Sequence, residues 1–140
     1  MNWFFRTDTR SYGLLAARLA LGVVMLPHGL QKTFGLFGGP GFDGTMGFMT
    51  SMGIPAFIAA LVILGESVGA IALILGFCTR FCAASLAVIM LGAILLVHAA
   101  NGFFAPNGYE YHILAIGLSA VLFFEGAGAW SLDSLLHKKK

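Results

Sequence analysis

The chain has 140 residues, of which 59% are hydrophobic and only 10% are charged, whereas about a quarter of the residues in soluble domains are charged. Eight basic and six acidic side chains are too few to cover a small soluble domain, which argues against a soluble enzyme and against a nucleic-acid-binding protein. The net charge of +2 comes largely from the run 138–140, which suits an anionic membrane face. The composition therefore predicts a protein whose main partner is the lipid bilayer.

The cysteine content excludes two kinds of redox chemistry. Cys78 and Cys82 are too few and too close to form a disulfide framework, and no C-x-x-C or C-x-x-C-H motif occurs. We therefore expect neither thiol redox chemistry nor covalent haem. The sequence also contains no obvious metal triad, so we expect no metal site.

Four apolar stretches approach the roughly 20 residues that a helix needs to cross a bilayer. In chain order they are 12–31, 55–75, 81–99 and 111–126, and the fourth is the shortest. Arg18 interrupts the first stretch and no small-residue cleavage site follows it, so we expect this stretch to be retained and not removed as a signal peptide. The sequence predicts an all-α fold, in which residues 1–140 form a single integral membrane domain with a bundle of four transmembrane helices.

The basic residues predict the orientation of this bundle. An even number of spans places both termini on one side, together with the turn between the second and third spans. That side holds six basic residues and the opposite side holds only Lys32; because cytoplasmic loops carry the excess of Lys and Arg, both termini are expected in the cytoplasm, where Cys78 and Cys82 would be reduced. The six residues are Arg6, Arg10, Arg80, Lys138, Lys139 and Lys140.

The connection 33–54 is long, rich in glycine and still apolar. A solvated linker would be more polar, and long loops without structure of their own are uncommon. We expect this segment to lie in the membrane interface, with a short amphipathic helix from Asp43 to Ser51. Gly65 and Gly69 predict the close-packing face of the second span, and Ser131 to Asp133 is typical of a helix cap.

Glu66 and Arg18 are ionisable residues inside predicted spans, where each costs about 2.5 to 3.5 kcal/mol on insertion scales. Counted along their helices, Glu66 lies roughly 16 Å and Arg18 roughly 21 Å below the outer face. We therefore expect a buried ion pair between them, because a guanidinium can bridge such a difference in depth. A purely architectural pair, which fixes the register of two helices, explains the same pattern.

Further ionisable residues converge on the outer half of the bundle. His28 and Lys32 lie near the outer end of the first span, and the antiparallel topology brings His98, Glu110 and His112 to the same level. Each alone has an ordinary structural explanation, such as a wetted helix end or a snorkelling lysine. Together they predict a small internal pocket, with the following candidate ligand-binding residues: Arg18, His28, Lys32, Glu66, His98, Glu110 and His112.

Several short motifs occur in a recognisable order. Arg18 is followed by H-G-x-x-K at 28–32, G-I-P at 53–55 and E-S-V-G at 66–69; later come G-F-C-T-R at 76–80, N-G-Y-E at 107–110 and G-A-G-A-W-S-L-D at 126–133. In this order and over nearly the whole chain, the sequence resembles the DoxX family of small four-helix bacterial membrane proteins. The resemblance implies a multi-pass protein of the bacterial cytoplasmic (inner) membrane, related to quinone-reactive membrane subunits of thiosulfate:quinone oxidoreductases.

The residues and the resemblance together favour a membrane subunit of a redox system that binds a quinone or a similar apolar ring compound. Such a ligand needs an apolar slot with groups that hydrogen-bond its carbonyl oxygens and exchange protons. A peripheral oxidoreductase subunit is then an expected partner, and a homo-oligomer is compatible with the sequence. Two alternatives remain open, namely a small-solute or proton transporter and a non-catalytic membrane scaffold for partner enzymes.

Overall fold

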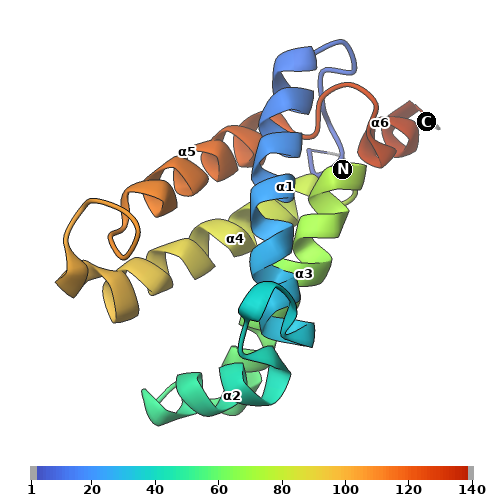
Figure 1. The fold of residues 1–140 in the computed structure, drawn as a ribbon. Helices are drawn as coiled ribbons and strands as arrows, with labels where there is room; N and C mark the ends of the chain where they lie inside the picture. The colour runs from blue at the N-terminus through green and yellow to red at the C-terminus, as the bar shows by residue number, and fades with distance from the viewer. Residues whose placement is uncertain (1–2, 139–140) are drawn as a thin grey trace.

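The computed structural model describes residues 3–138, and within this range all regular structure is helical (Figure 1). An all-α fold is confirmed. The elements are α1 (Tyr12–Phe34), a 3₁₀ turn η1 (Leu36–Gly38), α2 (Gly41–Ser51), α3 (Ala56–Leu75), α4 (Thr79–Ala93), a π-helical turn η2 (Ile94–His98), a 3₁₀ turn η3 (Ala99–Asn101), α5 (Glu110–Glu125) and α6 (Leu132–Lys138).

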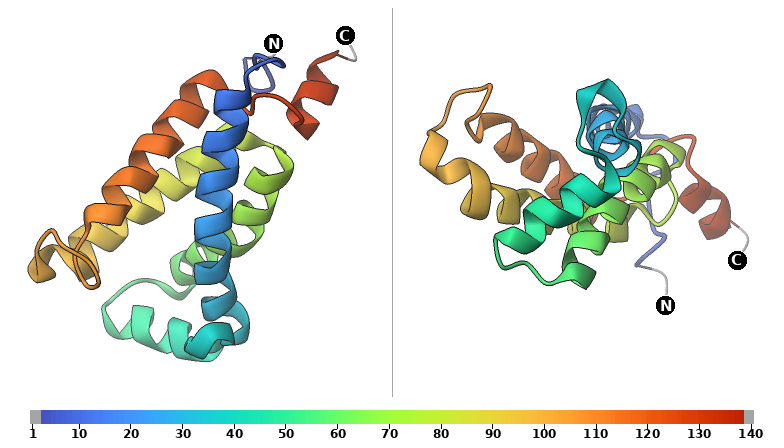
Figure 2. Two further views of the ribbon diagram at one scale, coloured as in Figure 1. Left: turned by 45° about the horizontal axis from the view of Figure 1, so that its top comes forward. Right: turned by 60° about the horizontal axis from the view of Figure 1, so that its bottom comes forward.

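The four long helices form two antiparallel pairs. α1 packs most extensively on α3, and α4 on α5, with smaller contacts between the pairs. The pairs come together at the end of the bundle that holds residues 3–11, the turn 76–78 and α6, which we call the termini end. They diverge toward the opposite end, which holds α2 and the segment 99–109 and which we call the loop end (Figure 2).

Among residues 3–138, three helices are long and apolar enough to cross a membrane. They are α1, α3 and the continuous helical segment Thr79–Asn101, which is α4 extended through η2 and η3. α5 has 16 residues, or roughly 24 Å at 1.5 Å per residue, and is the shortest of the four long helices. Large apolar side chains lie exposed along all four, including Val23, Leu64, Val88 and Leu114, which is the surface expected where lipid replaces water.

The segment between α1 and α3 contains a helix, as expected, and this helix is α2. It starts two residues before the predicted Asp43 and ends at Ser51 as predicted. The Thr45 side chain is buried and its hydroxyl donates to the Gly41 carbonyl at 2.7 Å. Phe42 and Phe48 remain exposed, which fits a helix that covers the loop end of the α1–α3 pair with apolar side chains free for lipid.

The close contact between α1 and α3 is made by glycines of α1. A Cβ on Gly29 would lie 2.6 Å from the Cα of Ser67, and one on Gly22 would lie 2.7 Å from Cγ1 of Ile74. The prediction of a close-packing face at Gly65 and Gly69 is only half right. Gly65 packs against Ile89 of α4, whereas a Cβ on Gly69 would meet nothing outside its own helix.

The predicted pair between Arg18 and Glu66 is wrong. Arg18 is 1% exposed and donates all five guanidinium N–H bonds to backbone carbonyls at the termini end. Nε donates to Ala127 at 2.9 Å, one terminal nitrogen donates to Leu73 and Ile74, and the other to Ala129 and Trp130. The carbonyls of Leu73 and Ile74 end α3, where the helix dipole is negative, so backbone dipoles and not a carboxylate stabilise this charge.

The pair fails because the outer ends of the two helices are not level. Gly29 contacts the backbone of Glu66, and Arg18 contacts Leu73 and Ile74. Arg18 therefore lies about eight residues of α3 from Glu66, or roughly 12 Å along the helix axis. The predicted depths of Arg18 and Glu66 assume that Lys32 and Pro55 lie at one level. They do not, because α3 begins well beyond the end of α1.

Three helix caps close the termini end. Ser131, the N-cap of α6, accepts the Ser134 amide at 3.2 Å, so the cap predicted in this region is present. Asp133 has a different role, because its two oxygens each accept a backbone amide at 2.8 Å, from Cys78 and from Thr79, and so cap α4. Arg80 caps α5 by donating to the carbonyls of Phe123 and Phe124.

Candidate functional site

Glu66 pairs with Lys32. The Lys32 ammonium lies 2.5 Å from Oε2 of Glu66, and the two side chains are 31% and 2% exposed. α3 carries the carboxylate into the α1–α3 interface, and the missing side chain of Gly29 lets α1 approach it. A lysine near the end of its helix can thus reach back to a carboxylate that has no other ionic partner among residues 3–138.

His28 lies one turn before Lys32, and residues four apart share a helix face. Its ring stacks on the ring of Tyr111 from α5, with centroids 5.7 Å apart and an interplanar angle of 7°. Both side chains are half-buried. This stack joins the two helix pairs where they diverge.

Two further histidines continue from Tyr111. His112 is 1% exposed, and its ring centroid lies 4.0 Å from that of Tyr111 and 4.3 Å from that of His98. Nδ1 of His112 has no hydrogen-bond partner among the described residues. Because buried polar atoms normally have partners, this nitrogen is suited to a ligand or to a bound water.

The π-helical turn η2 ends at His98. A π turn inserts one residue into the helical repeat and often occurs at functional sites, and here it ends at the residue that meets His112. Nδ1 of His98 lies 2.8 Å from the carbonyl oxygen of Asn107, so His98 links the cluster to the exposed loop before α5.

Of the seven candidate residues, the structure brings five together and separates two. Arg18 belongs to the termini end. Glu110 accepts the Ala105 amide at 2.9 Å and closes the loop before α5, so it borders the cluster, and its carboxylate forms no ion pair with a member of the cluster in the described part of the chain. The outer cluster, as we call the residues that meet, consists of His28, Lys32, Glu66, His98 and His112, together with Tyr111.

Tyr111 is not among the predicted site residues, because its position in the sequence predicts an interfacial anchor. A signal was nevertheless present, since it precedes His112 in the sequence and lies at the start of a span. The outer cluster combines an ion pair, three imidazoles and a phenol beside apolar helix faces, and it can donate hydrogen bonds and exchange protons. No group of three or more His, Cys, Asp or Glu suited to a metal occurs among the residues described.

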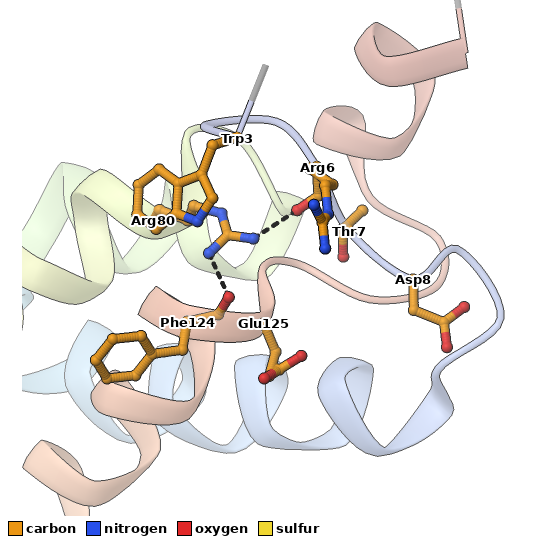
Figure 3. A pocket seen from close by; sticks show the side chains of 7 residues that line it. All are labelled: Trp3, Arg6, Thr7, Asp8, Arg80, Phe124 and Glu125. Carbon is orange, nitrogen blue, oxygen red and sulfur yellow. Dashed lines mark hydrogen bonds between the residues drawn. The ribbon is translucent and has the colours of Figure 1, made fainter. Parts of the chain in front are cut away.

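Two cavities lie at the termini end. One of about 300 Å³ is lined by residues from the N-terminal segment, α4 and α5 (Figure 3), and one of about 550 Å³ lies between α3 and α6. Neither is lined by a residue of the outer cluster. The outer cluster and the termini end are therefore two separate polar regions.

Comparison with known proteins identifies relatives over nearly the whole chain. A sequence profile of the DoxX family matches residues 13–99. The chain is 33% identical to "Inner membrane protein YqjF" of Escherichia coli over 91% of this chain and 94% of that protein, and 30% identical to "Inner membrane protein YphA" of the same organism over 95% and 96%. It is 28% identical to "Putative oxidoreductase CatD" of Bacillus subtilis over 91% and 90%. No solved structure was found to match.

Proposed function

Because this chain belongs to the DoxX family of membrane proteins, we propose that it is an inner-membrane subunit of a redox system and binds a quinone, or a similar apolar ring compound, at the outer cluster. The observation that carries the proposal is that His28, which stacks on Tyr111, lies one helical turn from Lys32, which pairs with the buried Glu66. The Bacillus relative carries the name "Putative oxidoreductase CatD", which supports a redox function. A peripheral oxidoreductase subunit would supply the electrons.

The residues of the outer cluster fit the chemistry of such a ligand. A quinone has two carbonyl acceptors on a flat apolar ring, and it takes up two protons when it is reduced by two electrons. The Lys32 ammonium and the imidazole N–H groups are donors, and the unpartnered Nδ1 of His112 provides a further polar contact. Stacked rings such as His28 and Tyr111 provide a flat apolar surface.

Each residue then has a role in the proposal. Lys32 and His28 bind and orient the carbonyl oxygens, and Glu66 holds the ammonium in place and can exchange a proton with it. His98 and His112 connect this position to the loop at Asn107, where water can replace the protons that are used. Arg18 and Glu110, which the sequence suggested as ligand contacts, have no part.

The test is a quinone titration of purified protein in detergent. We expect a soluble ubiquinone or menaquinone analogue to change the intrinsic Trp and Tyr fluorescence saturably. His28→Ala should weaken binding roughly threefold to tenfold, which is the effect of losing one hydrogen bond of about 0.5 to 1.5 kcal/mol, at an unchanged melting temperature. His137→Ala, at an exposed position of α6, is the matched control and should bind like wild type.

Absence of saturable binding in wild type, with and without a co-purifying oxidoreductase, would contradict the proposal and favour a scaffold. Solute movement by the protein alone in proteoliposomes would favour a transporter instead.

A further inference from the structure

A cavity of about 300 Å³ at the termini end is lined mainly by charged and aromatic side chains (Figure 3). Arg6 and Asp8 come from the segment before α1, and Glu125 is the last residue of α5. Trp3 and Phe124 border it as exposed rings. The cavity thus joins charges of both signs to aromatic side chains at the ends of membrane helices.

The opposite charges around this cavity do not neutralise one another directly. Figure 3 shows Arg6, Asp8 and Glu125 around the opening, and none of them forms an ion pair within residues 3–138. Carboxylates and a guanidinium on one small cavity without a mutual contact leave room for a ligand between them. Such a ligand needs a negative group for Arg6 and a positive group for the carboxylates.

Arg80 adds positive charge to one wall of the cavity. Its side chain is 3% exposed, lies 4.3 Å from the centroid of the Trp3 ring, and donates to backbone carbonyls of Phe123, Phe124 and Arg6. Neutral carbonyls accept from its two terminal nitrogens without cancelling its charge, and Nε has no hydrogen-bond partner among the described residues. The wall formed by Arg80 and Arg6 therefore favours an anionic group, while Glu125 and Asp8 favour a cationic one.

The position of the cavity indicates where its ligand comes from. It lies where α4 begins and α5 ends, and Trp and Tyr are enriched at this level in membrane proteins. Trp3 borders it directly, and Tyr12 and Trp130 meet edge to face at the same end of the bundle. A lipid headgroup can enter here while its acyl chains stay beside the exposed apolar faces of the helices.

We propose that this cavity binds the headgroup of a phospholipid with a primary ammonium group, such as phosphatidylethanolamine. The phosphate lies against Arg6 on the side of Arg80, and the ammonium donates hydrogen bonds to Glu125 and Asp8. A choline headgroup has no N–H to donate, and a glycerol headgroup has no positive charge. The cavity therefore selects ethanolamine over both.

Native mass spectrometry of the purified protein in detergent tests the proposal with dioctanoyl lipids as probes. We expect phosphatidylethanolamine to bind more tightly than phosphatidylcholine or phosphatidylglycerol. Arg6→Gln and Glu125→Gln should each weaken its binding roughly tenfold, the effect of losing one charge-assisted hydrogen bond. Arg6→Gln keeps the backbone carbonyl that Arg80 uses, so both variants should melt like wild type.

Matched controls are Arg10→Gln and Asp43→Asn, which change exposed charges outside the cavity and should leave lipid binding unchanged. Glycerophosphoethanolamine should compete with the lipid, and inorganic phosphate should compete much less. Equal affinity for the three lipids, an equal loss in the control variants, or full competition by phosphate alone would overturn the proposal, the last by revealing a simple anion site. Quinone binding at the outer cluster does not enter any of these outcomes.

Discussion

Lys32 and Arg18 are cations of the same helix, and the protein stabilises their charges with different partners. Lys32 meets a buried carboxylate, whereas Arg18 meets five carbonyl oxygens. The difference follows from the side chains. An ammonium is a compact charge with three donors, and a guanidinium presents five donors in a planar fork, so only arginine can satisfy a ring of carbonyls from two chain segments.

A double-mutant cycle distinguishes the two cations. Lys32→Gln leaves the Glu66 carboxylate buried and unpaired, which typically costs about 3 to 5 kcal/mol, and less here because Lys32 is 31% exposed. We expect Lys32→Gln and Glu66→Gln each to lower the melting temperature in detergent, and the double mutant to recover part of the loss. Arg18→Gln combined with Glu66→Gln should be additive, and recovery in that pair would contradict the structure.

At the scale of elements, the α1–α3 interface depends on two small residues. Gly22 and Gly29 let the helix backbones approach, and their close contact sets the level of Glu66 relative to Lys32. The sequence contains the G-x-x-x-G pattern on α3 instead, and this pattern alone does not reveal which helix supplies the small residues. The contact is therefore evident only in the three-dimensional packing.

Gly29→Ala tests this interface. The added methyl group would overlap the backbone of α3 at Glu66 and Ser67, so we expect a loss of about 1 to 3 kcal/mol, as for other overpacked sites, measured by thermal unfolding. Gly117→Ala on α5 is the control, since its Cβ would meet nothing within 4 Å. It should be neutral, or more stable by at most about 1 kcal/mol through helix propensity. Equal losses in both variants would show that the contact is not tight.

Asp133 joins the turn 76–78 to α6, and it affects the chemistry of Cys78. Burial raises the pKa of the Cys78 thiol, and the negative charge of Asp133 raises it further. A raised pKa means less thiolate at a given pH. In a Cys82→Ser background, Asp133→Asn should therefore lower the pKa of Cys78 and shift the pH profile of its alkylation by a soluble maleimide to lower pH. An unchanged profile would show that the charge of Asp133 does not act on the thiol.

At the scale of the whole molecule, composition and periodicity predict the helices well because apolar length is a local property. Each end of the expected spans 12–31, 55–75 and 111–126 lies within three residues of the corresponding end of α1, α3 and α5. The Arg18–Glu66 pair could not be predicted correctly, because it depends on the relative heights of two helices joined by a long segment. The role of Asp133 likewise depends on a contact between residues 54 and 55 positions apart.

Orientation in the membrane remains a prediction from charge. In a background with Cys78 and Cys82 replaced by alanine, a cysteine at Asn107 should react with an impermeant maleimide in intact cells, and one at His137 should react only after the membrane is opened. Both positions are exposed, so a lack of reaction reports sidedness and not burial. The reverse pattern would contradict the assignment of both termini to the cytoplasm.

The carbonyl ring around Arg18 has a consequence for biosynthesis. Arg18 enters the membrane with the first helix, but three of the five acceptors of its guanidinium, at Ala127, Ala129 and Trp130, belong to a segment that the ribosome makes only after all four long helices. A nascent chain that stops before this segment carries a charge in its first helix with only the end of α3 to solvate it. The first helix therefore reaches its stable state only once residues 127–130 have been made, and products truncated within residues 126–131 should be recognised as misfolded and degraded.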